Sequence, residues 1–423
     1  MPRPPLARRI FKGLTAFALL GFLGVLALLG SLWLEQRSEV TLPTPTGPFA
    51  VGRAIQAWTD DAHADPLAPV SGTRRELLVW IWYPAVPGSA GADDYSPAWM
   101  REASARRSAA AEVAKPAPLI VRALTPIFRL LTRDESRVHA HSLRNPGLLA
   151  ADRPYPVALM RGGASTSVKN YTTLAEDLAS HGYVVVGLDA PYRTGRVVFP
   201  DGRLIDRAPE NDPELYSGEE FQRVGLKLLA AWTADLAFVL DRLEQLNVSD
   251  ASGEFTGRLD MTRVGVFGHS FGGAQAAQFC SEDSRCKAGI DIDGAPLGSV
   301  IETGLHRPFM FLLSDHGREG DPESQKIKAD IKSIYDRLPR DGRSRVEISG
   351  AFHFTFSDDG AFLKSRLVRG ALRVFGKLGI DGPRQVAITA YCVRSFFDAH
   401  LKTATRSPFN LPSPLYPEIR VIE

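Results

Sequence analysis

The residues best suited to chemistry lie in one glycine-rich stretch, GHSFGG, at positions 268–273. A strand-forming sequence, RVGVF, leads into it, and a helix-forming sequence, AQAAQF, follows it. This order is typical of a nucleophile elbow, in which a serine lies on a strained turn between small neighbours. We therefore predict that Ser270 is a nucleophile and that Gly268 and Gly272 leave room for its turn. The Phe271 N–H, at the start of the helix, is then placed to stabilise an oxyanion. The alternative is a plain glycine-rich turn in which Ser270 caps the helix.

A serine nucleophile needs a histidine to take its proton and an acid to orient that histidine. With a nucleophile elbow the chain order is serine, acid, histidine, so the base must follow the elbow. Of the nine histidines in the chain, those after the elbow are His306, His316, His353 and His400. His353 comes just after the last predicted strand, where the base is expected, whereas His306 precedes a strand and His400 falls in a terminal helix. We predict that His353 is the base.

The acid has two candidates at the ends of consecutive predicted strands. Asp293 ends the first strand after the elbow, and Asp315 ends the second. Folds of this kind often take their acid from the second position, so the residues by themselves leave the choice open.

A second oxyanion donor is expected in a loop that follows an earlier strand. The sequence RGGA at 161–164 follows the strand-like VALM and contains glycines that allow a substrate to approach the backbone. We predict that the Ala164 N–H is this donor, the alternative being an ordinary tight turn.

Strand and helix patterns alternate from Tyr155 onward. A long helix is expected over 219–246, a shorter one over 170–181, and a hairpin near Asp201 and Gly202. The predicted strands are 49–51, 76–83, 156–161, 183–189, 263–268, 288–293, 309–314 and 345–349. Strands that alternate with helices form a mostly parallel sheet with helices on both faces, so the sequence predicts the α/β class.

The N-terminal segment predicts a membrane anchor. Residues 14–34 are uncharged and apolar, about 21 residues that suffice to cross a ~30 Å hydrocarbon core. Basic residues precede the segment, so the rest of the chain is expected on the non-cytoplasmic side, periplasmic or extracellular. The alternative is a cleaved signal peptide and a secreted body, but its apolar region should be shorter, roughly 7–15 residues.

The remaining chain is expected to form one large domain. The predicted division is an anchor at 1–36, a Pro-rich linker at 37–48, an α/β domain at 49–406 with inserts near 88–153 and 191–216, and an extended tail at 407–423. Within the first insert, residues 118–133 carry apolar and arginine-bearing faces, which suit either lipid headgroups or a surface helix packed on the body.

Composition and charge exclude several partners. The 423 residues contain 50 Lys and Arg against 48 Asp and Glu. The chain therefore lacks the excess of basic residues that is typical of nucleic-acid-binding proteins. His139 and His141 form an HxH pair without further ligands nearby, so no metal or other cofactor is expected. Cys280 and Cys286 stand close in sequence outside the cytoplasm and are predicted to form a disulfide, the alternative being two small buried residues.

Several motifs together resemble the platelet-activating factor acetylhydrolases of the plasma type, a lipase-like branch of the α/β-hydrolases. They run from about residue 78 to 356 and comprise WYP at 82–84, YPV at 155–157, DLASHGY at 177–183, GHSFGGA at 268–274, GIDID at 289–293 and GAFH at 350–353. The resemblance implies an α/β-hydrolase fold with the acid on the strand directly after the elbow, and therefore favours Asp293 over Asp315. The chain departs from the family in the oxyanion loop, where Gly162-Gly163, or Arg161-Gly162 under a one-residue shift, replaces the usual His-Gly.

The resemblance also implies a serine-dependent carboxylic ester hydrolase that forms an acyl-enzyme. The implied substrates are phospholipids with short or oxidised acyl chains, or similar small esters. A general carboxylesterase, a polyester hydrolase or a dienelactone-hydrolase-like enzyme is the alternative within the same chemistry. A catalytically silent, membrane-tethered binding protein is the alternative from another class. The preferred acyl chain and the oligomeric state are left open by the sequence.

Overall fold

A mostly parallel sheet forms the centre of the protein in the computed structural model, which describes residues 6–114, 133–315, 321–362, 366–374, 379–402 and 413–422. Within these residues the sheet has twelve strands in the order β1-β5-β2-β3-β7-β6-β10-β11-β12-β13-β14, with β4 paired to β5. The strands are β1 (Val40–Thr41), β2 (Ala50–Ala64), β3 (Arg74–Ala85), β4 (Ala92–Asp94), β5 (Val138–Arg144), β6 (Tyr155–Arg161), β7 (Val184–Asp189), β10 (Leu259–His269), β11 (Cys286–Ile292), β12 (Phe309–Ser314), β13 (Arg343–Ile348) and β14 (Ile419–Val421). From β7 through β13 every neighbouring pair is parallel, which confirms the predicted α/β class.

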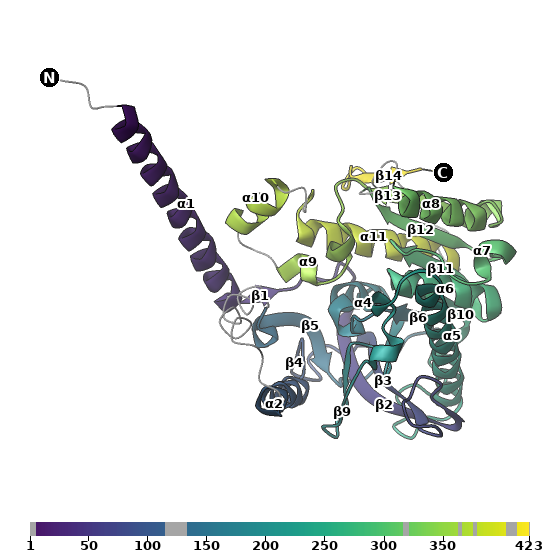
Figure 1. Ribbon diagram of the computed structural model, residues 1–423. Helices are drawn as coiled ribbons and strands as arrows, with labels where there is room; N and C mark the ends of the chain where they lie inside the picture. The colour runs from purple at the N-terminus through teal and green to yellow at the C-terminus, as the bar shows by residue number, and fades with distance from the viewer. Residues whose placement is uncertain are drawn as a thin grey trace.

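Helices cover both faces of this sheet (Figure 1). One face packs on α5 (Gly218–Val248), α6 (Phe271–Glu282) and α8 (Pro322–Tyr335), and the other on α4 (Thr172–Ser180) and α11 (Gly382–Leu401). Successive side chains of a strand point to opposite faces, so Val266 joins the first core and Phe267 the second. This double burial explains why the central strands read as continuous apolar runs rather than alternating ones.

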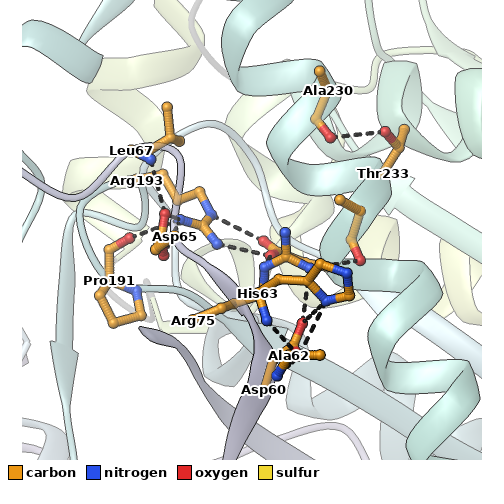
Figure 2. A network of polar contacts seen from close by, with 12 residues as sticks. Asp60, Ala62, His63, Asp65, Leu67, Arg75, Pro191, Arg193, Ala230 and Thr233 are labelled. Carbon is orange, nitrogen blue, oxygen red and sulfur yellow. Dashed lines mark hydrogen bonds and ion pairs between the residues drawn. The ribbon is translucent and has the colours of Figure 1, made fainter. Parts of the chain in front are cut away.

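The segment between the β7 strand and α5 is held at its start by a buried ion-pair network (Figure 2). The Arg193 guanidinium lies 2.8 Å from the Asp65 carboxylate and 2.7 Å from the Asp235 carboxylate, and all three side chains are fully buried. Leaving one member of such a network unpaired typically costs about 3–5 kcal/mol. Beyond it, β8 (Arg196–Val198) and β9 (Leu204–Asp206) form the hairpin predicted near Gly202.

Helix α1 (Leu6–Arg37) projects from the body (Figure 1). Within its stretch from Gly13 to Arg37, an 18-residue window has a mean hydropathy of 2.3 and only 6% of it is buried, so by length and composition the helix suits a membrane span. An N-terminal signal sequence has the same character. The helix end is tied to the body because Arg133 Nη2 lies 2.7 Å from Glu35 Oε1.

Parts of the predicted linker at 37–48 and of the predicted extended tail at 407–423 pair with the sheet of the domain. In the predicted linker, β1 pairs with β5, and the Leu42 side chain is buried. In the predicted tail, β14 pairs antiparallel with β13 and completes the sheet. The first insert contributes β4, β5 and helix α2 (Ala98–Ala114), while its two-faced segment at 118–132 lies outside the described residues.

Candidate active site

The predicted nucleophile lies on a sharp turn between β10 and α6. Ser270 has φ +56° and ψ −124°, a conformation that a residue with a side chain rarely adopts. A Cβ atom at Gly268 would lie 2.4 Å from the backbone carbonyl of Gly272, and one at Gly272 would lie 2.5 Å from the carbonyl oxygen of Gly162. Both predicted glycines are therefore required by close backbone approach, as a nucleophile elbow demands.

Three predicted residues from distant parts of the chain meet at the carboxyl ends of the parallel strands. His353 Nε2 lies 3.2 Å from Ser270 Oγ, and His353 Nδ1 lies 2.8 Å from Asp293 Oδ2. Asp293 directly follows β11, and His353 opens the turn that follows β13. A hydroxyl, an imidazole and a carboxylate linked in this order have the geometry with which a serine is activated for attack on a carbonyl.

The Asp293 carboxylate is kept ionised by its partners. Burial alone would raise the pKa of Asp293, but hydrogen bonds from His353 and from Ser314, together with the His353 charge, lower it below its ordinary value. The Ser314 N–H and Oγ donate to Asp293 Oδ1 at 2.8 and 2.9 Å. A charged carboxylate can therefore hold the His353 ring in one orientation and stabilise its protonated form.

The alternative acid, Asp315, has a backbone partner in the turn that carries His353. Asp315 Oδ2 accepts a hydrogen bond from the Gly350 N–H at 2.6 Å. Gly350 has φ +77° and begins the turn that carries His353. Asp315 therefore stabilises that turn, while Asp293 holds the imidazole.

The predicted oxyanion loop lies against the elbow. A Cβ atom at Gly163 would be 3.6 Å from the Ser270 Cβ atom, and one at Gly162 would be 2.6 Å from the Thr166 carbonyl oxygen. The Thr166 N–H donates to the Gly163 carbonyl at 3.1 Å. Since the Gly163 carbonyl and the Ala164 N–H belong to one planar peptide, this bond fixes the direction of the predicted donor.

A cavity of about 910 Å³ opens beside Ser270 and His353. Apolar side chains, among them Leu313 of β12, Ile327 and Ile331 of α8, and Phe352, form one part of its wall. Charged side chains form another part: Lys328, Lys332, Arg345 and Glu347. Its size is at the upper end of the range for small-molecule sites, so it admits an ester with a substantial acyl or alcohol group.

No role was predicted from the sequence for two residues of the site, His269 and Tyr171. His269 lies under the His353 ring with 4.6 Å between ring centroids, and its Nδ1 is 2.8 Å from the Tyr171 hydroxyl. The position of His269 directly before the nucleophile was a usable signal. Tyr171 offered none, because it reaches the elbow only through the fold.

The HxH pair, from which no metal site was predicted, and the two paired cysteines have other partners. His139 Nε2 contacts Glu39, and His141 Nε2 contacts the Leu42 carbonyl. In the described parts of the chain no group of three or more His, Cys, Asp or Glu side chains is placed to hold a metal ion. Cys280 and Cys286 form a disulfide that joins the end of α6 to the start of β11.

Comparisons with known proteins agree with the geometry. The family model "Platelet-activating factor acetylhydrolase, isoform II" matches residues 243–406, which contain all three meeting residues. A "Probable 1-alkyl-2-acetylglycerophosphocholine esterase" of Arthroderma benhamiae is 25% identical over 401 residues, 90% of this chain and 94% of its own length. The platelet-activating factor acetylhydrolase of Cavia porcellus is 25% identical over 54% of each chain, and that of Canis lupus familiaris is 27% identical over 50% of each.

A solved structure extends the similarity to the whole fold. The ferulic acid esterase from Streptomyces cinnamoneus superposes with a TM-score of 0.69 and 27% sequence identity, over 91% of this chain and 100% of that one. The comparisons confirm the resemblance drawn from the motifs and the α/β-hydrolase fold. The chain is a carboxylic ester hydrolase of the serine type.

Proposed function

We propose that this ester hydrolase cleaves phospholipids with a short or oxidised acyl chain, or small esters of similar size, through an acyl-enzyme on Ser270. The observation that carries the proposal is the hydrogen-bonded chain from Ser270 through His353 to Asp293 at the mouth of a large cavity. The names of the relatives, which concern acetylated ether phospholipids, support the lipid substrate.

The proposed reaction begins with proton transfer. His353 Nε2 accepts the Ser270 hydroxyl proton while Oγ attacks the ester carbonyl carbon, and Asp293 stabilises the imidazolium that forms. The Phe271 and Ala164 N–H groups donate to the oxyanion of the tetrahedral intermediate. Its collapse expels the alcohol, which takes the proton from His353. Water then attacks the acyl-enzyme by the same steps and releases the acid.

A second candidate substrate class is a soluble ester of an aromatic acid. The similarity to a ferulic acid esterase over nearly the full chain favours it, and the cavity wall includes Phe352 beside His353. Both candidates use the same chemistry and differ only in what occupies the cavity.

For the location, we propose that α1 stays as an anchor and that the body lies on the non-cytoplasmic side. The Cys280–Cys286 disulfide supports this side, because disulfides persist in oxidising compartments. The basic residues that precede the apolar stretch support the same orientation.

The test is hydrolysis of p-nitrophenyl esters from acetyl to long acyl chains, followed by short-acyl phospholipids and feruloyl esters. Ser270→Ala is the control in each assay. We expect Ser270-dependent turnover that falls as the acyl chain lengthens and extends to the phospholipids. Turnover confined to feruloyl esters would select the second candidate. No Ser270-dependent turnover of any ester would leave the silent binding protein as the better account.

A further inference from the structure

The Tyr171 hydroxyl links the oxyanion loop to the elbow. Tyr171 is buried, accepts a hydrogen bond from the Gly163 N–H at 3.1 Å and lies 2.8 Å from His269 Nδ1. A hydroxyl carries a single proton, and here its oxygen already accepts one bond. Among the described residues, His269 Nδ1 is the other hydrogen-bond partner of this hydroxyl, and with Nδ1 unprotonated the Tyr171 proton points to it. This arrangement makes a directional chain from Gly163 through Tyr171 to His269.

This chain requires that His269 stay neutral. Burial and the neighbouring His353 lower the pKa of His269 to about 3, against smaller opposing effects of Asp293 and the His353 backbone. His269 is therefore neutral near pH 7, so one of its ring nitrogens carries no proton and can accept the Tyr171 hydrogen bond. Its ring contacts those of His353 and Phe356, with centroid distances of 4.6 and 5.7 Å.

The oxyanion loop needs such support because two glycines form it. Gly162 and Gly163 have no side chains to pack, so hydrogen bonds must define their backbone. Thr166 holds the Gly163 carbonyl and Tyr171 holds the Gly163 N–H, so the peptides on both sides of Gly163 are fixed next to Ser270. Donors that stabilise an oxyanion are effective only when they are preorganised to within a fraction of an ångström.

We propose that Tyr171 and His269 are positioning residues for the ester hydrolysis: Tyr171 fixes the oxyanion loop, and His269 accepts its hydroxyl proton and supports the His353 ring. The inference rests on the proposed acyl-enzyme reaction. The residue before the nucleophile and a tyrosine about a hundred residues away in sequence then act together to position the groups that stabilise the transition state.

The first test is Tyr171→Phe, with Tyr183→Phe as the matched control. Tyr183 is equally buried, and its hydroxyl donates to Asp398 at 2.9 Å on the α11 side of the sheet. Removing one oxyanion donor outright costs about 10²–10³ in kcat, so loosening the loop should lower kcat by about 10–100-fold. We expect KM to change by less than about 2-fold, because ground-state binding does not depend on the oxyanion donors.

Affinity for a trifluoromethyl ketone, which forms a tetrahedral oxyanion adduct with serine, separates this role from a structural one. We expect Tyr171→Phe to weaken ketone binding in proportion to kcat, and Tyr183→Phe to leave both at the wild-type level. Wild-type kcat and ketone affinity in Tyr171→Phe, or equal losses in the two variants, would overturn the inference. Absence of Ser270-dependent hydrolysis in the wild type would instead overturn the proposed function.

The second test compares two substitutions of His269. Asn places an acceptor oxygen near the position of Nδ1 but leaves space, whereas Leu fills more of the volume and accepts no hydrogen bond. If the acceptor matters, His269→Asn retains more kcat than His269→Leu. A Leu variant as active as the Asn variant or better would show that His269 acts by packing alone and would overturn its part in fixing the oxyanion loop.

Discussion

Ser270 and Asp293 both have a positive φ, +56° and +54°, which residues with a side chain rarely adopt. Each such residue costs of order 1–3 kcal/mol and persists only where the surroundings determine it. Here the Ser270 N–H donates to the Ile292 carbonyl, and the Asp293 N–H donates to the Leu312 carbonyl, both at 2.8 Å. The sheet therefore holds both residues in strained turns, from which their side chains reach opposite nitrogens of His353.

The acid is tested by comparing Asp293→Asn with Asp315→Asn. An amide at position 293 can donate to His353 Nδ1 and so favours the wrong tautomer, which in a serine triad lowers kcat by about 10⁴. Asp315 accepts a hydrogen bond from the Gly350 N–H, and the side-chain oxygen of an Asn can accept the same bond. Asp315→Asn should therefore lower kcat by less than about 10-fold. The measurement is kcat on p-nitrophenyl acetate, and a larger loss in Asp315→Asn would move the acid to the later strand.

Asp291, two residues before Asp293, gives a prediction about pH and stability. Its side chain is fully buried, Oδ1 accepts from the Gly294 N–H at 2.8 Å, and Oδ2 has no partner among the described residues. Burial raises the pKa of Asp291 to about 8, with a further increase from the Asp293 charge. Above its unfolded pKa of about 4, the unfolded chain loses this proton while the folded chain keeps it, so stability falls as pH rises.

Asp291→Asn removes this titration and keeps the acceptor for Gly294. Relative to the wild type, the variant should gain free energy of unfolding by up to about 1.4 kcal/mol per pH unit between pH 5 and 8. Urea unfolding at several pH values measures the difference. A difference that does not change with pH would mean that Asp291 is ionised in the folded protein.

At the scale of single residues, the sequence predicts roles that follow from neighbouring residues in the chain, and it misses roles that arise from contacts between distant segments. Ser270 and His353 are recognisable because the elbow spacing and the strand ends define them. Asp293 and Asp315 both end strands, and only the resemblance favoured one, since the choice depends on which turn faces His353. Tyr171 carries no local signal, because its role comes from a loop and an elbow that meet only in the folded sheet.

Among the elements, the bounds of strands with strong apolar patterns are predicted to within a few residues. The bounds of strands whose sequence lacks such a pattern, and which form only because they pair with distant segments, are not. The prediction marked only residues 49–51 at the start of β2, although the strand extends over Ala50–Ala64. Its sequence is rich in Ala and Asp, which disfavour strands, and pairing with β3 along most of its length overrides that preference. The two-residue β1 and three-residue β14 likewise owe their structure to partners far away in sequence.

The packed linker can be tested with two truncations, one starting at Glu35 and one at Gly47. The first keeps the Glu35–Arg133 ion pair, β1, the buried Leu42 and the hydrogen bonds of Thr46 to Asp177, and we expect a soluble and active body. The second loses all of them. Burial of one leucine and two hydrogen bonds are worth about 3 kcal/mol or more, so its free energy of unfolding should be lower by that amount.

Chemical unfolding of the two truncated proteins in the same buffer makes the comparison, with kcat on p-nitrophenyl acetate as a check of the site. Equal stability would mean that residues 35–46 act as the free spacer that their proline content suggests.

For the whole molecule, the proposed anchor and the proposed lipid substrate together determine how the enzyme meets that substrate. A short-acyl phospholipid partitions into a bilayer, and an enzyme held by α1 in the same bilayer encounters it at a raised effective concentration, as tethered binding partners do. The body starting at Glu35 has the same site but must find the surface by diffusion. A small soluble ester offers no such distinction, because it reaches both forms from solution.

We therefore expect the full chain, reconstituted in vesicles that contain a short-acyl phospholipid, to hydrolyse it at least about 10-fold faster than the body added at equal concentration. On p-nitrophenyl acetate the two should have equal kcat/KM, which controls for damage to the site. Diluting the vesicles should slow the body and leave the anchored form unchanged, because only the body must bind the surface anew. Equal phospholipid rates at every dilution would mean that α1 contributes nothing to substrate access, and that the enzyme takes monomeric esters from solution.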